Sequence, residues 1–241
     1  MITPKWATVG IDPAPSKDTV ACIGGDTFET IRAAHVPDFV AALVRDNARL
    51  VLAWDAPLSF DATNGYSDRP ADRETRAWVK HQVQAGRIAL GAVSVLPFAG
   101  CPHWAITCAA LGLPFGATDA PLLLATTAQD GAQLVVEVHP AVTLARWWVA
   151  QPRTQPLPKY KGLRKDAAAA AIRAIRTELT NEVVIPEAAA ISDDRLDAWI
   201  AWKMAMDFST GDAVWTGSPQ AGGYVVPPLA ASDQPRKPVG S

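Results

Sequence analysis

The stretch TVGIDPAPSK, residues 8–17, runs a short apolar segment directly into Asp12, two prolines and a lysine. Aspartate before proline is common in turns for purely local reasons, so Asp12 taken alone fits either a turn residue or a functional carboxylate. The same arrangement recurs in RLVLAWDAPLS, residues 49–59, where Asp55 follows a second apolar run. Two predicted strands thus each end in an acid. Other carboxylates that could lie close to Asp12 are therefore candidates for the same site.

The segments around these two acids predict part of a mixed sheet. Residues 6–12, 19–25 and 26–31 are three successive strand-like segments separated by turn residues, which is typical of an antiparallel meander. Residues 36–48 then place apolar side chains at helical spacing, and the run before Asp55 indicates the next strand. The predicted order is therefore three strands, a helix and a fourth strand.

A third acid, Glu137, lies inside the otherwise apolar run of residues 134–138. An ionised carboxylate is costly to bury without a partner, so strand interiors usually exclude it. Side chains alternate along a strand, and Glu137 near a strand end is equally compatible with a side chain that points to water. Both interpretations remain open for Glu137.

The segment ISDDRLDAWIAWKMAMDF, residues 191–208, predicts a helix capped by Ser192. Asp193 and Asp194 then lie in its first turn, where negative charge is stabilised by the helix dipole. That explanation does not extend to Asp197, which lies one turn beyond Asp194 and beside a face of alanines. Small side chains permit a close approach to a sheet, so we expect Asp194 and Asp197 to face the strand ends.

These elements in this order resemble the RNase H-like fold. More closely, the motifs VGIDPAPSK, WDAPLS, DRPADRETR, EVHPAV and DDRLDAWIAWKMA are similar to an uncharacterised family of predicted RNase H-like nucleases, over residues 9 to about 205. The pair Asp194 and Asp197 also resembles the paired acids on the final helix of Holliday-junction resolvases. The resemblance implies an α/β fold: a mixed five-stranded sheet with its first three strands antiparallel, helices on both faces, and a long helical insertion.

The resemblance also sets the expected domain organisation. Residues 1–226 are expected to form a single domain, with the insertion at about residues 60–132 because that segment is too long for an ordinary connection. The sequences AVWTG and GYVVP predict a hairpin near the end of this domain. The proline-rich residues 227–241 are expected to be a disordered tail.

The same resemblance implies a catalytic carboxylate cluster. Its expected members are Asp12, Asp55, Glu137, Asp194 and Asp197. The four aspartates are expected as metal ligands, with Asp12 bridging, whereas Glu137 is either a ligand or a base that orients water. Oxygen-only ligands suit Mg²⁺ or Mn²⁺, and a pair of such ions can activate water and stabilise a leaving oxygen.

Charge limits how such a protein would contact nucleic acid. A net charge of -2 and a pI near 6.1 argue against a basic surface that coats DNA or RNA, so phosphate contacts should be local. Two basic segments, residues 69–87 and 153–165, offer Arg69, Arg73 and Lys161 as substrate-binding candidates, although both segments also fit solvated faces. Arg69 and Arg73 alternatively join Asp72 in an internal ion-pair network that anchors the insertion.

The expected function is metal-dependent hydrolysis of phosphodiester bonds in DNA or RNA. Actin-like ATPases share the strand order and an early GID strand end, which leaves a nucleotide phosphohydrolase or phosphotransferase as an alternative, although those proteins usually duplicate the fold. A binding module that keeps the acids without turnover is the third possibility. The sequence has no apolar run of about 18 residues and no signal-peptide pattern at its start, so we expect a cytoplasmic protein without a membrane partner.

Overall fold

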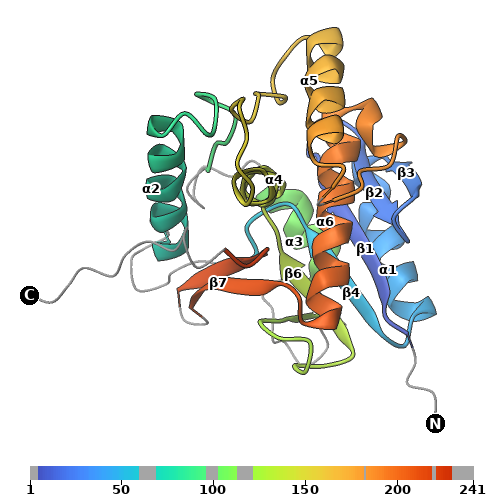
Figure 1. The fold of residues 1–241 in the computed structure, drawn as a ribbon. Helices are drawn as coiled ribbons and strands as arrows, with labels where there is room; N and C mark the ends of the chain where they lie inside the picture. The colour runs from blue at the N-terminus through green and yellow to red at the C-terminus, as the bar shows by residue number, and fades with distance from the viewer. Residues whose placement is uncertain are drawn as a thin grey trace, which may run out of the picture.

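The computed structural model describes residues 5–59, 69–95, 103–112, 122–181, 183–218 and 221–229. Its centre is a mixed six-stranded sheet with the strand order β3-β2-β1-β4-β6-β5 (Figure 1). The strands are β1 (Ala7–Asp12), β2 (Thr19–Ile23), β3 (Thr27–Ile31), β4 (Leu50–Trp54), β5 (Leu123–Leu124) and β6 (Gln133–Glu137). The first three strands pair antiparallel, and β4, β6 and β5 continue the sheet parallel to β1. The predicted RNase H-like α/β architecture is confirmed, with the two-residue β5 added at the edge.

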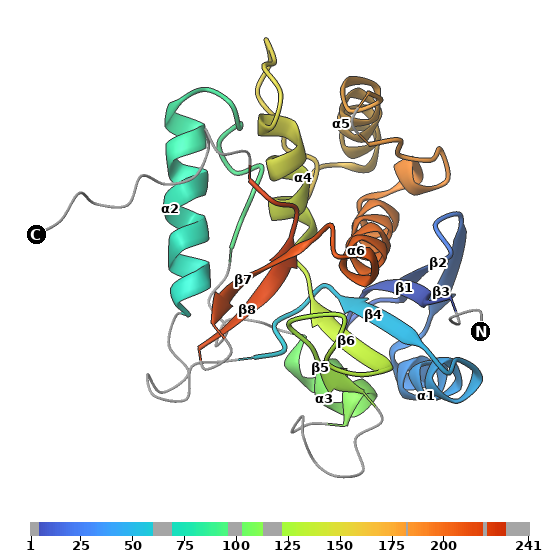
Figure 2. The ribbon, with the colours of Figure 1, turned by 60° about the horizontal axis from the view of Figure 1, so that its bottom comes forward.

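Helices cover both faces of the sheet, as expected. The helices of the described residues are α1 (Val36–Asp46), α2 (Pro70–Gln84), α3 (Trp104–Leu111), α4 (Pro140–Val149), α5 (Lys165–Glu178) and α6 (Asp193–Thr210), with short 3-10 turns η1 (Ala33–His35) and η4 (Ala189–Ile191). Figure 2 shows α1 and α3 on one face and α6 on the other, and α4 and α5 pack against α6. The helices α4 and α5 were not among the sequence-based predictions.

Side chains alternate along β4, so this one strand contributes to the hydrophobic cores on both faces of the sheet. Leu50, Leu52 and Trp54 pack in the core beneath α1 and α3, whereas Val51 and Ala53 pack in the core beneath α6. All five side chains are fully buried. A parallel strand covered on both faces is apolar at every position, which is why residues 50–54 form a continuous apolar run in the sequence.

The helix α6 lies directly on β1, backbone against backbone. A Cβ atom added at Gly10 would lie 2.0 Å from the backbone nitrogen of Trp202 and 2.2 Å from the carbonyl oxygen of Ala198. Ala198, Ala201 and Ala205 are fully buried on the same helix. The close docking predicted from the alanine face is therefore present, and it requires glycine on the strand as well as alanine on the helix.

The expected insertion contributes α2, α3 and β5 within its described parts. Residues 60–68, 96–102 and 113–121 of this segment lie outside the described residues, as do residues 230–241 of the expected tail. The single-domain organisation over residues 1–226 remains a prediction. The predicted terminal hairpin is confirmed as the antiparallel pair β7 (Val214–Ser218) and β8 (Gly222–Val226). Within the described ranges, every helix is too short or too polar to cross a bilayer.

Candidate metal centre

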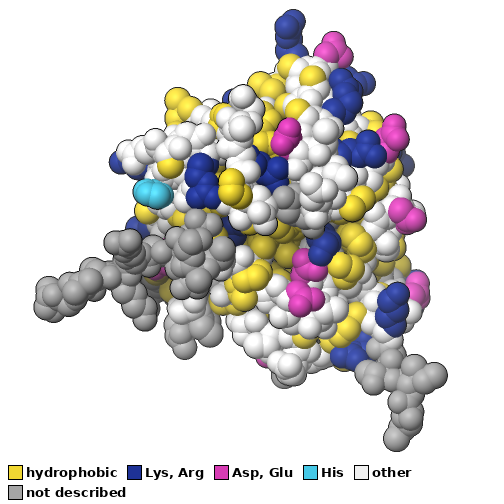
Figure 3. Space-filling model, viewed as in Figure 1, with side chains coloured by type: hydrophobic (Ala, Val, Ile, Leu, Met, Phe, Trp, Pro, Cys, Tyr) yellow, Lys and Arg dark blue, Asp and Glu magenta, His cyan; other side chains and the backbone are white. Residues whose placement is uncertain are grey.

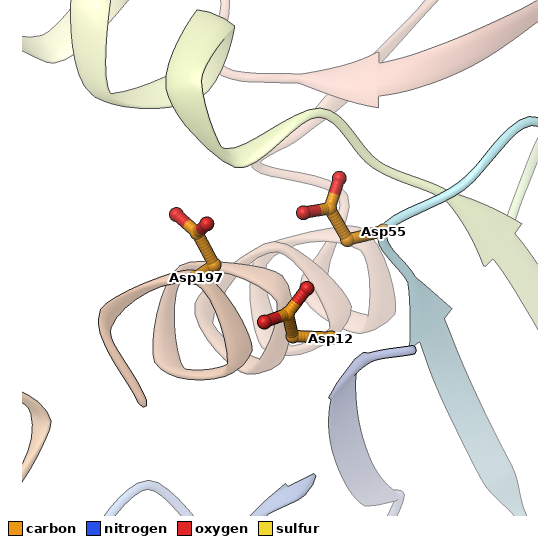
Figure 4. A group of neighbouring side chains, drawn as sticks. All are labelled: Asp12, Asp55 and Asp197. Carbon is orange, nitrogen blue, oxygen red and sulfur yellow. The ribbon is translucent and has the colours of Figure 1, made fainter. Parts of the chain in front are cut away.

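Three carboxylates from three elements converge at one edge of the sheet. Asp12 is the last residue of β1, Asp55 follows β4 directly, and Asp197 lies in the second turn of α6. Because β1 and β4 are parallel neighbours with Ile11 opposite Trp54, the two residues that follow these positions reach the same edge. Figure 4 shows the three carboxylates pointing toward a common space, and one oxygen from each lies within 4.8 Å of the others.

The three acids lie in a pocket of about 280 Å³. Its other charged or ionisable lining residues include Lys17, Arg69, His103, Glu137, Lys161 and Asp194. The pocket therefore collects all five of the predicted catalytic acids, but their partners within it differ. Three form the cluster of Figure 4, and the other two have basic partners of their own.

Burial and mutual repulsion govern the titration of the cluster. Burial, followed by the charges of Asp197 and Asp55, raises the pKa of Asp12 well above its ordinary value. Burial also raises the pKa of Asp55 to about 7, although the nearby Lys161 ammonium acts in the opposite direction. These carboxylates are thus held closer together than their charges favour, and a bound cation would relieve the repulsion.

Asp197 is nearly inaccessible to solvent and has a fixed orientation. Its Oδ1 accepts a hydrogen bond of 2.7 Å from the Tyr160 hydroxyl, and its Oδ2 lies 2.5 Å from the Lys161 Nζ. Burial raises the pKa of Asp197 even though Lys161 and Tyr160 stabilise the charged form. Burial would lower the pKa of Lys161, but Asp197, Tyr160 and Asp55 outweigh it and raise that pKa well above its ordinary value. Lys161 is therefore a permanent cation of the site.

Asp194 lines the pocket but lies outside the three-acid group. Its Oδ1 pairs with Lys17, which comes from the turn after β1. Ser192 caps α6 by accepting a hydrogen bond of 3.2 Å from the Arg195 N–H, so Asp193 and Asp194 occupy the first helical turn as predicted. The carboxylate expected as a fourth metal ligand is thus already neutralised by a lysine.

Glu137, at the end of β6, belongs to a second, buried ion network. Its Oε1 and Oε2 accept hydrogen bonds of 2.6 and 2.8 Å from Arg69, and Oε2 also accepts one of 2.8 Å from the Leu58 N–H. Arg69 donates further to both carboxylate oxygens of Asp72, at 2.8 and 3.0 Å. Arg69, Asp72 and Glu137 are each almost completely buried. The Arg69–Asp72 pair agrees with the internal network that the sequence offered as the alternative to phosphate contact, but the observed third member is Glu137, where the sequence had named Arg73.

The remaining substrate-binding candidates occupy different settings. Arg73 is exposed on the first turn of α2. Lys161 lies at the pocket with 40% of its side chain exposed, in the connection between α4 and α5. On the face shown in Figure 3, Lys and Arg side chains are interspersed with Asp and Glu, which agrees with the nearly balanced charge of the chain.

Sequence reasoning missed two residues that line the pocket, Lys17 and His103, and a third, Tyr160, that contacts a pocket acid from the core. Tyr160 and Lys17 were assigned no role, although each contacts a predicted acid. His103 lines the pocket, where burial and the charges of Lys161 and Lys17 lower its pKa. The lysine in TVGIDPAPSK is five residues from Asp12 and was a usable signal, whereas nothing in the local sequence distinguishes Tyr160.

One comparison with known proteins identified a related family. The family model described as "Protein of unknown function (DUF429)" matches residues 10–221. No curated protein and no solved structure matched the chain. The matched range contains Asp12, Asp55 and Asp197, together with their neighbours Tyr160 and Lys161.

Proposed function

Given that the chain belongs to the family described as a protein of unknown function (DUF429), we propose that it is a divalent-metal-dependent nuclease that hydrolyses phosphodiester bonds in DNA or RNA. The convergence of Asp12, Asp55 and Asp197 carries this proposal. All three offer carboxylate oxygens, which is the donor set that Mg²⁺ and Mn²⁺ prefer. Burial, followed for Asp12 by the charges of the other two acids, raises the pKa of Asp12 and of Asp55, and a cation bound between them would favour their charged forms.

In this scheme the three aspartates hold the cation at the end of the sheet. A bound divalent cation would lower the pKa of a coordinated water and reduce negative charge at the scissile phosphate. Lys17 and Lys161 place ammonium groups in the same pocket, where they are available to the phosphate oxygens of a bound strand. Local contacts of this kind suit a chain whose net charge is only -2.

The other two acids take supporting roles in this proposal. Asp194 pairs with Lys17, and Glu137 anchors Arg69, in the lining of the pocket. Because both oxygens of Glu137 already accept hydrogen bonds, we assign this residue to holding the first turn of α2 against β6. Arg69 shares that structural role, while Arg73 remains a candidate for phosphate contact from the exposed side of α2.

The decisive experiment is a cleavage assay on single-stranded, duplex and branched DNA and RNA, with Mg²⁺, with Mn²⁺ and with a chelator. We expect cleavage that needs the metal and is lost in Asp12→Asn. Asp46→Asn is the matched control, because Asp46 lies at the exposed end of α1 and pairs with its neighbour Arg45. Wild-type cleavage that persists in the chelator would contradict the proposal.

The same preparation separates the alternative functions. Release of phosphate from nucleoside triphosphates, without cleavage of any nucleic acid, would identify a phosphohydrolase of the actin-like type. Metal-dependent binding of nucleic acid without either reaction would identify a binding module. Both measurements use the Asp12→Asn variant as their blank.

A further inference from the structure

We propose that the carboxylate cluster takes one divalent cation rather than a pair, because the Lys161 ammonium supplies the positive charge of the second. This inference rests on the proposed function and revises the pair of ions expected from the sequence. It makes Lys161 a permanent part of the metal centre, in addition to any contact that it makes with a substrate.

The distribution of charge around the pocket supports a single ion. Asp194 is paired with Lys17, and Glu137 is paired with Arg69. Among the described residues, the acids whose oxygens lie close enough together to share a metal are the three of Figure 4, and the Lys161 ammonium lies beside two of them. When all three carboxylates are ionised, they and the one ammonium carry a local charge of about minus two, which one divalent cation would neutralise.

The position of the ammonium group supports the same conclusion. The Lys161 Nζ lies 2.5 Å from Asp197 Oδ2 and 3.8 Å from Asp55 Oδ2. The Lys161 Nζ thus lies beside the carboxylates of both Asp55 and Asp197. Among the described residues, none donates a hydrogen bond to the Asp12 carboxylate, and Lys161 acts on it only from a distance. Asp12 is therefore the acid of the cluster whose charge is left for a cation to neutralise.

The neighbouring residue fixes the lysine in this place. Tyr160 is fully buried, and its hydroxyl donates to Asp197 Oδ1 at 2.7 Å. The backbone at Lys161 is consequently tied to the same carboxylate that its ammonium group contacts. Although 40% of the Lys161 side chain is exposed, the preceding residue, Tyr160, is part of the core. This anchoring distinguishes Lys161 from a surface lysine that happens to lie near an acid.

The test counts metal ions on the full-length protein with MnCl₂ alone, by isothermal titration calorimetry and by electron paramagnetic resonance of free Mn²⁺. We expect one ion per wild-type chain. Lys161→Met should bind that ion at least about tenfold more tightly, because the competing positive charge is gone. Lys159→Met is the matched control, since Lys159 is an exposed residue of the same connection, and its affinity should equal that of the wild type.

Two ions per wild-type chain would overturn this inference while leaving the proposed metal site intact. An unchanged affinity in Lys161→Met would also overturn it, because the ammonium group would then not share the site. The absence of Mn²⁺ binding in every variant would instead remove the metal centre and the proposed function with it. Lys161→Gln, which keeps a long polar side chain, serves if Lys161→Met does not fold. Thermal unfolding with and without MnCl₂ should then show a larger metal-induced gain in Tm than in the wild type.

Discussion

Replacing Asp197 by asparagine tests the metal centre with the least change in shape. The side chain is 4% exposed, so the charge it presents to a cation is weakly screened. At an effective dielectric constant of about 20, two unit charges about 4 Å apart interact by about 4 kcal/mol. Loss of one ligand charge in three should therefore weaken cation binding by about 3 kcal/mol, or roughly a hundredfold.

Folding should tolerate the Asp197→Asn replacement. The amide oxygen of asparagine can still accept the hydrogen bond that Tyr160 donates to Oδ1. Burial raises the pKa of Asp197, so the folded state does not favour its charged form. The opposing loss is the contact with Lys161, whose ammonium group would face an amide. We expect these effects to cancel to within about 1 kcal/mol, which corresponds to a change in Tm of about 2–4 °C.

The assay compares Asp197→Asn with Asp193→Asn in Mn²⁺ titrations and in cleavage of a substrate that the wild type cuts. Asp193 opens α6 and serves the helix dipole, so its replacement should leave metal affinity and most of the cleavage rate intact. Asp197→Asn should lose both while retaining its Tm. Equal, near-wild-type metal affinity in the two variants would refute the assignment and leave Asp197 a structural residue.

Three further predictions concern the surroundings of the site. Arg69→Met leaves the buried carboxylate of Glu137 without its cation, so urea unfolding should show a loss of about 3–5 kcal/mol, and unchanged stability would contradict the ion-network role. Gly10→Ala should lower the free energy of unfolding by about 3 kcal/mol or more and weaken Mn²⁺ binding, because the new methyl group would lie 2.0 Å from the α6 backbone. The control is Gly131→Ala, whose new methyl group would lie 3.3 Å from its nearest neighbour, a side chain; this variant should remain stable and keep its metal affinity. The metal-free protein should lose stability as the pH rises from about 4 to about 7, by up to about 1.4 kcal/mol per pH unit. Over this range, folded Asp55 retains a proton that the unfolded chain has already released. Asp55→Asn should flatten that slope in thermal unfolding across the same pH range, and an unaltered slope would show that another group is responsible.

The sequence predicted the elements whose patterns are local. The strand before Asp12, the strand before Asp55 and the alanine-faced helix with Asp197 all lie where the patterns placed them. Each of these elements has a local pattern of its own, either the spacing of its apolar side chains or a capping residue at the start of a helix. The parallel pairing of β1 with β4 agrees with the order of the elements along the chain. The convergence of three acids was therefore accessible without coordinates.

The partners of those acids were not accessible in the same way. Residues 134–137 of β6 are all buried, so the alternation of side chains along the strand carried no information about where Glu137 points. Its partner Arg69 is far away in the sequence, at the start of α2, and that helix packs against the hairpin of β7 and β8. Tyr160 and Lys161 depend similarly on the course of the chain between α4 and α5, which is set by packing against α6. Long-range partners of this kind leave no local pattern to read.

The close contact between Gly10 and α6 has a consequence for the order in which the site is made. During synthesis β1 leaves the ribosome early, whereas α6 follows after most of the chain has been translated. Until α6 docks, Asp12 and Asp55 lack the third carboxylate, and no helix packs against Gly10 of β1. A nascent chain thus carries no complete metal centre. Under the proposed function, hydrolysis would begin only when the last helix closes onto the first strand, so a partly synthesised chain would not cleave the RNA around it.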